Sequence, residues 1–330
     1  MKKLLLNTVQ IIFVLSLTVL FFSCDKTNDP VSNQNTTSGG NSGWKSQTSN
    51  ITNSLFSVSF VNSSFGMAAG ENGKVLRTTN GGAFWSVVHA GSAYWLKGIK
   101  CIDENNAVAV GYNGTVIKTT DGGSTWFDQY TGVTNQINAV TFKDANAGYL
   151  TGYAGSVFMT SNGGANWYPE IQVQTTMYGM FFVDYVYGLL CGSGGQIYRT
   201  WDGGYNWVTA PSGTGVDLNG IAFINANTGV VVGNLGEIHM SIDGGQGWYS
   251  CTSNVTNTLF SVSMPTINRI TAVGGGGVIV TSTNWGGVWR LLKSNVGVNL
   301  YSVCFIDDNT GFAVGEQGVI LATTNGGETY

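Results

Sequence analysis

The chain of 330 residues has a net charge of −4, and only 10% of its residues are charged. This sparse and slightly acidic charge argues against nucleic acid as a partner, because nucleic-acid-binding proteins carry dense basic patches. The chain also has 48 glycines but only 4 prolines, and no stretch after residue 25 has the periodicity of a helix. These features predict an all-β protein with many short strands and tight turns.

The N-terminus has the pattern of an export signal. Lys2 and Lys3 precede an interrupted apolar run that ends in LFFSC, which is typical of a signal peptide rather than a spanning helix. LFFSC resembles the lipobox of bacterial lipoproteins, although Phe21 stands where that box usually has leucine. We therefore expect residues 1–23 to be a lipoprotein signal peptide and Cys24 to be acylated. An ordinary secretory signal and a signal anchor are the alternatives.

Residues 24–43 are polar, rich in glycine and serine, and poor in apolar side chains. This composition predicts a flexible tether between the lipid and the folded domain. A multiply acylated Cys24 would hold the protein firmly on a membrane. The expected location is the bacterial cell envelope, on the periplasmic side or at the cell surface.

An eight-residue box recurs seven times after the tether. It reads TTNGGAFW at 78–85, TTDGGSTW at 119–126, TSNGGANW at 160–167, TWDGGYNW at 200–207, SIDGGQGW at 241–248, STNWGGVW at 282–289 and TTNGGETY at 323–330. The closing aromatic residues are 41, 41, 40, 41, 41 and 41 residues apart, and a Gly-x-x-Gly motif first seen at Gly70 keeps the same rhythm. This period is that of a propeller blade. The sequence therefore predicts a seven-bladed β-propeller over residues 44–330.

Each unit is expected to hold four strands. In the first unit these are Leu55–Val61, Gly66–Gly70, Lys74–Thr79 and Phe84–Val88. The position of Ser57 is Ser, Gly or Ala in every unit. A small residue there would let neighbouring blades approach closely.

The seventh unit stops at Tyr330, where its outer strand should begin. Trp44 lies 41 residues before Trp85, in phase with the box aromatics. We therefore expect Trp44–Thr48 to supply the outer strand of the last blade, which would remove an exposed sheet edge. A truncated C-terminus is the alternative.

These boxes resemble the Asp-box repeat of bacterial neuraminidases, Ser/Thr-x-Asp-x-Gly-x-Thr-Trp. The wider unit, as in Phe223–Trp248, resembles the photosystem II stability/assembly factor family of Asp-box propellers, over residues 44–330. The resemblance implies a protein-binding or assembly scaffold without catalysis. Asp boxes also occur in sialidases, sortilin-type receptors and xyloglucan-cleaving enzymes, so they indicate architecture better than activity.

The acceptor residue of each box is expected to be structural. Its side chain can accept backbone hydrogen bonds in a tight turn while the glycines adopt positive φ. Asparagine replaces aspartate in four of the seven boxes, a change that keeps an acceptor but would weaken a metal site. We therefore expect no metal and no cofactor at these turn residues: Asn80, Asp121, Asn162, Asp202, Asp243, Asn284 and Asn325.

The arginines argue against a sialidase, which needs an arginine cluster for the substrate carboxylate. Arg77 and Arg199 occupy equivalent places on third strands, Arg269 is expected between a first and a second strand, and Arg290 follows a box tryptophan. None lies on an inner strand. A two-carboxylate glycosidase stays open, because such a pair need only face each other across the channel; the candidate acids are Glu71, Asp217, Glu237 and Glu316.

The remaining titratable side chains predict little chemistry. His89 and His239 form no metal pair by position, and His239 is expected to be a satisfied core residue. The cysteines at 101, 191, 251 and 304 fall on different blades. We expect them to be free thiols, because a disulfide needs close Cα atoms.

The favoured function is a non-catalytic, monomeric envelope scaffold that binds another envelope protein, with a glycan-binding or glycan-cleaving protein as the alternative. In a propeller, the turns between second and third strands share one face with the connections between blades, and loops on rigid scaffolds carry function. On that face, acids and aromatics gather at Glu71, Tyr94, Trp95, Tyr112, Tyr130, Tyr153 and Glu316. Such a group suits protein hot spots or sugar stacking, although tyrosines that merely cover neighbouring loops would look the same.

Overall fold

The computed structural model describes residues 43–91, 94–170 and 173–328. The expected signal peptide, Cys24, the tether up to residue 42 and the closing Tyr330 lie outside the described residues. Within the described ranges, no helix is long and apolar enough to cross a membrane.

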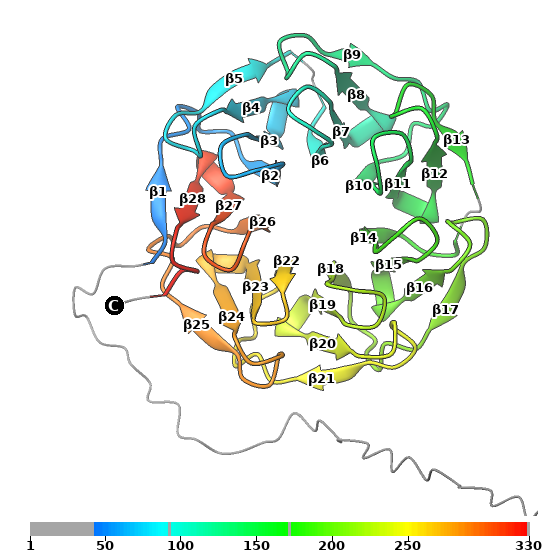
Figure 1. The fold of residues 1–330 in the computed structure, drawn as a ribbon, viewed down its shortest axis with the longest axis vertical. Helices are drawn as coiled ribbons and strands as arrows, with labels where there is room; N and C mark the ends of the chain where they lie inside the picture. The colour runs from blue at the N-terminus through cyan, green and yellow to red at the C-terminus, as the bar shows by residue number, and fades with distance from the viewer. Residues whose placement is uncertain (1–42, 92–93, 171–172, 329–330) are drawn as a thin grey trace, which may run out of the picture.

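The described chain forms seven four-stranded antiparallel sheets arranged as blades around a central channel (Figure 1). Blade one consists of β2 (Leu55–Phe60), β3 (Gly66–Gly70), β4 (Val75–Thr78) and β5 (Ser86–His89). Blade two consists of β6 (Leu96–Cys101), β7 (Ala107–Gly111), β8 (Val116–Thr119) and β9 (Phe127–Asp128). Blade three consists of β10 (Ile137–Phe142), β11 (Gly148–Gly152), β12 (Val157–Thr160) and β13 (Tyr168–Pro169). Blades four and five are β14 (Met177–Phe182), β15 (Gly188–Gly192), β16 (Ile197–Thr200) and β17 (Val208–Ala210), and β18 (Leu218–Phe223), β19 (Gly229–Gly233), β20 (Ile238–Ser241) and β21 (Tyr249–Cys251). Blades six and seven are β22 (Leu259–Thr266), β23 (Arg269–Gly274), β24 (Ile279–Ser282) and β25 (Arg290–Leu292), and β26 (Leu300–Phe305), β27 (Gly311–Gly315), β28 (Ile320–Thr323) and β1 (Lys45–Gln47). The predicted seven-bladed propeller is confirmed.

The outer strand of the first blade begins later than predicted. It covers Ser86–His89 rather than Phe84–Val88, because Trp85 belongs to the box and turns into the core, where it is 1% exposed. The outer strands β9 and β13 contain only two residues each.

Small residues on the inner strands join neighbouring blades. The Ser57 hydroxyl accepts a hydrogen bond from the Ile99 amide of the next blade at 3.1 Å. The Ser302 hydroxyl of blade seven likewise accepts a hydrogen bond from the Val58 amide of blade one at 3.3 Å. These bonds satisfy strand amides that face the adjacent sheet rather than their own ladder. The predicted close approach of the blades therefore also has a polar component.

The boxes form the turns that the sequence predicts. In the second box the Thr119 hydroxyl donates to Asp121 at 2.9 Å and accepts from the Gly123 amide at 2.8 Å. The Asp121 carboxylate also accepts from the hydroxyl and the amide of Thr125, and these bonds lower its pKa to about 2. In six of the described boxes, the Asp or Asn side chain accepts a hydrogen bond from the backbone amide of the residue four positions later.

The box tryptophan packs on the last aromatic residue of the inner strand in its own blade. Trp85 meets Phe60 edge-on, with ring centroids 5.9 Å apart. Equivalent pairs occur in blades three, four and five. In these four blades the box, which follows the third strand, is packed against the first strand through an aromatic contact.

The ring closes as predicted. Strand β1 pairs antiparallel with β28, with Lys45 opposite Ala322 and Gln47 opposite Ile320. Figure 1 shows this N-terminal strand as the outermost strand of the last blade. Trp44 is 2% exposed and meets Phe305 edge-on at 5.7 Å. Trp44 thus takes the place of the box tryptophan of blade seven.

The position predicted for Arg269 is wrong. Thr266 pairs with Arg269, so β22 and β23 are joined by only two residues and Arg269 begins the second strand. Its buried guanidinium donates to the Gly326 carbonyl at 3.1 Å and lies 3.3 Å from the Glu328 carboxylate. Arg269 therefore ties blade six to the last box of blade seven.

The cysteines and His239 are buried or half-buried inside the blades. The four described cysteines are free, as predicted. His239 is 3% exposed, and its Nε2 atom lies 2.5 Å from the Glu237 carboxylate. Its Nδ1 atom has no hydrogen-bond partner among the described residues. The predicted burial of His239 is confirmed, but only one ring nitrogen is satisfied.

Candidate functional site at the channel mouth

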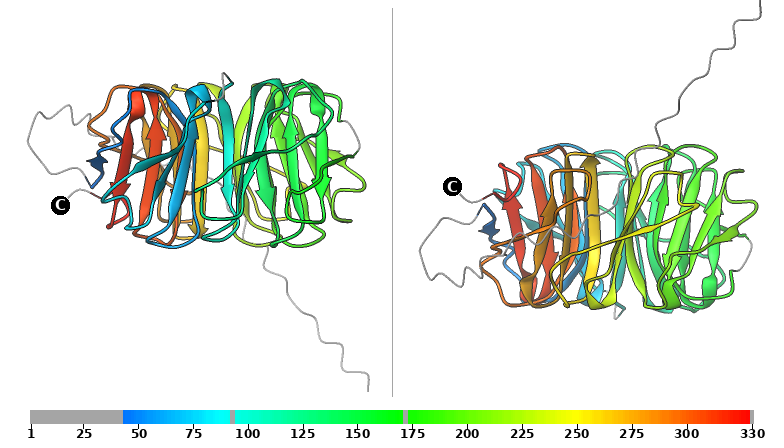
Figure 2. Two further views of the ribbon diagram at one scale, coloured as in Figure 1. Left: turned by 90° about the horizontal axis from the view of Figure 1, so that it is seen from above. Right: turned by 90° about the horizontal axis from the view of Figure 1, so that it is seen from below.

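The blades run between two faces of the ring (Figure 2). We call one of them the mouth face; it carries the connections between blades and the short 3-10 turns that begin at Glu71, Tyr112, Tyr153, Ser193, Asn234, Gly275 and Glu316. The opposite face carries the boxes and is called the box face. All the candidate binding residues from the sequence lie on the mouth face.

Backbone hydrogen bonds fix the loops of the mouth face. The Tyr112 amide donates to the Trp95 carbonyl at 2.9 Å, and the Glu71 amide donates to the Ser54 carbonyl at 2.9 Å. A Cβ atom on Gly111 would lie 1.9 Å from the Trp95 carbonyl oxygen, so only glycine permits this approach. The side chains at these loops therefore project from a rigid base.

A ring of seven side chains lines the channel just below this face. It consists of the second residue of each inner strand: Phe56, Lys97, Asn138, Tyr178, Asn219, Phe260 and Tyr301. The pairing register shifts directly after the first residue of each inner strand, as between Leu55 and Ser57. Such a bulge takes the second residue out of the ladder. The hollow that this ring lines has a volume of about 240 Å³.

Aromatic side chains connect the channel to the rim in blades seven, one and two. The rings of Tyr301 and Phe56 are 5.2 Å apart, and Phe56 stacks on Trp95 at 5.5 Å. Trp95 then meets Tyr112 edge-on at 5.6 Å. Trp95 and Tyr112 remain 40% and 38% exposed. We call Phe56, Trp95, Tyr112 and Tyr301 the aromatic cluster.

The carboxylates of the mouth face are held by their own loops. Glu316 accepts hydrogen bonds from the Tyr301 hydroxyl and the Asn299 side chain, both at 2.8 Å. These bonds lower the pKa of Glu316. Glu71 accepts from the Ser54 amide at 3.0 Å, and Asp217 accepts from the Gly194 amide at 2.8 Å.

Geometry of this kind does not favour a glycosidase. A general acid in such an enzyme needs a raised pKa. The pKa of Glu316 is instead lowered, mainly by the hydrogen bond from the Tyr301 hydroxyl. Glu237, another candidate acid, is paired with His239. Among the described residues, no group of three or more His, Cys, Asp or Glu side chains could hold a metal ion.

The structure brings some of the predicted site residues together and leaves others apart. Trp95 and Tyr112 belong to the aromatic cluster, and Glu316 is bonded to its Tyr301. The pKa of Tyr301 is raised mainly by burial, with a small contribution from the nearby charge of Glu71. Tyr130 and Tyr153 are 89% and 58% exposed and make no ring contact with the cluster in the described structure, and Tyr94 is 45% exposed. The assignment of these residues to binding stays a prediction.

Sequence reasoning missed the side chains that line the channel, including Phe56, Lys97 and Tyr301. A signal for them was present. The second residue of the inner strand varies from repeat to repeat, between the invariably apolar first residue and the invariably small third residue. A variable position inside a regular strand is typical of a side chain that has left the common core.

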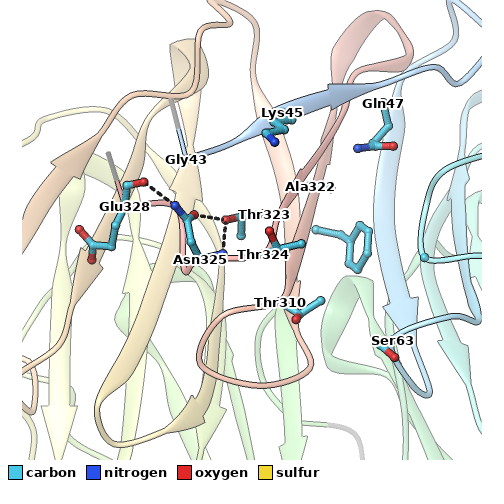
Figure 3. A pocket seen from close by; sticks show the side chains of 12 residues that line it. Gly43, Lys45, Gln47, Ser63, Thr310, Ala322, Thr323, Thr324, Asn325 and Glu328 are labelled. Carbon is cyan, nitrogen blue, oxygen red and sulfur yellow. Dashed lines mark hydrogen bonds between the residues drawn. The ribbon is translucent and has the colours of Figure 1, made fainter. Parts of the chain in front are cut away.

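A second hollow, of about 580 Å³, lies at the seam where the ring closes. Figure 3 shows Lys45 and Gln47 of β1 on one side of it, with Thr310 and Ser63 from the loops of neighbouring blades. Gln47 lies 41 residues before Val88, which packs into the core between blades one and two. At the seam, the polar Gln47 stands where blade one has the apolar Val88, and the hollow lies beside it.

Comparison with known proteins supports the resemblance drawn from the repeats. The family model described as photosynthesis system II assembly factor YCF48 matches residues 249–324. The resemblance to this family is confirmed. No curated protein sequence matches the chain.

Solved propeller structures match almost the whole folded domain. A structure described as YCF48 bound to D1 peptide aligns with a TM-score of 0.73 and 20% identity, over 86% of this chain and 97% of the other. YCF48 from Cyanidioschyzon merolae aligns with a TM-score of 0.72 and 20% identity, over 85% and 98%. The WD40 propeller domain of Doa1 aligns equally well, with a TM-score of 0.73 at 12% identity, over 86% and 96%. At these identities the structural matches show the fold alone.

Proposed function

We propose that this protein is a non-catalytic scaffold that binds another protein through the mouth face of blades seven, one and two. The observation that carries the proposal is the aromatic cluster, which runs from Tyr301 in the channel to the exposed rings of Trp95 and Tyr112. Tryptophan and tyrosine side chains exposed on a rigid base are among those that contribute most binding energy at protein interfaces.

Similarity to known propellers supports a protein partner rather than a small molecule. The matching family is described as an assembly factor, and one similar propeller is described with a D1 peptide bound. The carboxylates of this face are engaged by their own loops, which does not favour acid–base chemistry. A monomeric binding module is consistent with these features.

The proposal includes the cell envelope as the place of action. It is supported by the apolar N-terminal run that ends in Ser23 and Cys24, which has the anatomy of a lipoprotein signal. A protein tethered by lipid to the membrane would meet its partners within the reach of an unstructured linker. Its proposed partner is therefore another envelope protein.

A glycan-binding protein is the second candidate. Trp95 and Tyr112 are exposed aromatic rings, and such rings also stack on the apolar faces of sugars. The two candidates make opposite predictions for a glycan array, which should show no selective binding if the partner is a protein.

Simultaneous substitution of Trp95, Tyr112 and Tyr153 by alanine is expected to weaken capture of the envelope partner by roughly a hundredfold, as for the loss of interface hot spots. The melting temperature should fall only modestly, because all three side chains lie at the rim and are at least 38% exposed. The measurement is affinity for the purified captured protein, with thermal unfolding beside it.

The matched control is a triple alanine variant on the box face, at Phe84, Trp201 and Trp285. These side chains are at least as exposed as Trp95 and Tyr112, so the control removes exposed aromatic surface from the opposite side. Unchanged partner affinity in the mouth-face variant, or an equal loss in the control, would refute the proposed site.

A further inference from the structure

We propose that the channel mouth binds a carboxylate side chain of the protein partner, with the ammonium group of Lys97 as its counter-ion. This inference rests on the proposed function, because it assigns the chemistry of the segment that enters the mouth. It assigns recognition of the partner to one charged residue, Lys97, within a ring of otherwise neutral side chains.

The charges of the inner strands support an anionic ligand. The seven strands that form the channel wall contain two charged residues, Lys97 and Lys100, and neither an aspartate nor a glutamate. Both lysines lie on β6 in blade two. The wall of the channel is therefore positively charged, although the chain as a whole carries a net charge of −4.

The ammonium group of Lys97 has no counter-ion in the described structure. Its Nζ atom lies 3.8 Å from the centroid of the Phe56 ring and 5.9 Å from that of Tyr301, and it forms none of the ion pairs. Burial lowers the pKa of Lys97. A cation–π contact offsets only part of the cost of burying a charge, so a carboxylate that reaches this ammonium group would be stabilised by it.

Lys100 extends the positive field deeper into the channel. Its charge opposes the rise in the pKa that burial causes at Cys101 of blade two and at Cys304 of blade seven. Cys101 lies in the same blade as Lys100, and Cys304 lies on the far side of blade one, since blades two and seven flank that blade. Lys97 is the lysine that lines the hollow, and Lys100, three residues further along the same strand, adds a second positive charge.

Nearby carboxylates do not occupy the position of this anion. Glu316 is bonded to Tyr301 and Asn299, Glu71 to the Ser54 amide, and Asp217 to the turn at Gly194. These acids border the mouth but are directed to their own loops. Their charge disfavours a highly acidic partner and favours a single carboxylate that passes between them.

The dimensions of the site favour a side chain over a folded element. A hollow of about 240 Å³ holds one or two side chains but no helix. Phe56 of its lining stacks on Trp95, which in turn contacts Tyr112. A glutamate or aspartate next to an apolar or aromatic residue would place its carboxylate at Lys97 and its neighbour on these rings.

The test uses the full chain with 15N- and 13C-labelled lysine and follows the side-chain signal of Lys97 by NMR. The probes are 3-phenylpropionate, which joins a carboxylate to an aromatic ring, and the neutral 3-phenylpropionamide. The carboxylate should shift the Lys97 signal in a saturable way, and binding should raise the pKa of Lys97 because the anion stabilises its charged form. The amide should bind at least about tenfold more weakly.

Substitution Lys97→Met should abolish the preference for the carboxylate over the amide while leaving the melting temperature close to that of the wild type, since methionine keeps the apolar stem on Phe56. Lys97→Arg should retain the preference. The control Lys45→Met removes an exposed lysine on β1, outside the channel, and should change nothing.

Three results would overturn the inference: no saturable shift, an equal shift with the amide, or an unchanged preference in Lys97→Met. Tighter binding of free glucuronate than of 3-phenylpropionate would also contradict it, by assigning the site to an acidic sugar. Failure here is distinguishable from failure of the proposed function. If Lys97 binds no carboxylate while the mouth-face alanine variant still loses its partner, the scaffold stands and only the anion site is wrong.

Discussion

Deletion of residues 43–49 is expected to unfold the ring at temperatures where the intact chain is stable. The deletion removes Trp44, which is 2% exposed and packs on Phe305, and the whole of β1, which pairs with β28. Loss of one buried tryptophan costs about 3–5 kcal/mol, and the free edge of β28 adds unpaired backbone groups. Because a domain of this kind is stable by only about 5–15 kcal/mol, most of its stability should disappear.

The comparison is with a deletion of residues 25–40, which lie in the expected tether and should leave the melting temperature unchanged. Point variants separate the two contributions within the closing strand. Trp44→Ala should be strongly destabilising, whereas Lys45→Ala should be close to neutral because its side chain is exposed. Equal melting temperatures for the two deletions would refute the closure of the ring by the N-terminal strand.

Substitution Cys24→Ser is expected to move the protein from the membrane fraction to the soluble fraction. The thiol of Cys24 would carry the lipid, and serine cannot take its place in thioether formation. The lipid on Cys24 is the expected source of membrane attachment, because its acyl chains insert into the bilayer. Fractionation of cells with detection of the protein in each fraction measures the effect.

A variant at a neighbouring position provides the control. Ser23→Ala keeps a small residue before the cysteine and should remain in the membrane fraction. Persistence of Cys24→Ser in the membrane fraction after a carbonate wash would rule out the lipoprotein assignment. In that case the apolar run at the N-terminus would act as a signal anchor.

Most of the architecture followed from the repeats. The period of the boxes, the Gly-x-x-Gly motif and the alternation within strands all specify one local structure, and repetition of this structure allows a closed ring. Trp44 was informative because it kept the phase of the box aromatics although no box surrounds it. Its place in the structure, against Phe305, is the one that a box tryptophan takes.

The channel ring and the position of Arg269 did not follow from the repeats. Phe56 and Lys97 lie at a bulge, and a bulge depends on the pairing of two strands rather than on the sequence of one. Arg269 moved into β23 because a two-residue turn replaced the longer loop of the other blades. Both cases are local departures from the repeat, which a period alone cannot predict.

The Asx turns between first and second strands were also missed. Asp103, for example, accepts hydrogen bonds from the amides of Asn105 and Asn106 at 2.7 Å. Its pKa is lowered mainly by donors from Asn106 and Asn105 against the opposing effect of burial. These turns lack the glycine pair of the boxes, so composition did not mark them.

The most direct test of the proposed scaffold is site-specific photo-cross-linking from the mouth face. The photoreactive p-benzoylphenylalanine replaces Tyr112 in one variant and Tyr205, an exposed tyrosine of the box face, in the other. Both substitutions keep an aromatic ring, so neither should alter the fold. Irradiation is expected to cross-link the envelope partner to position 112 and not to position 205. Cross-linking from position 205 alone would contradict it and would place the partner on the box face.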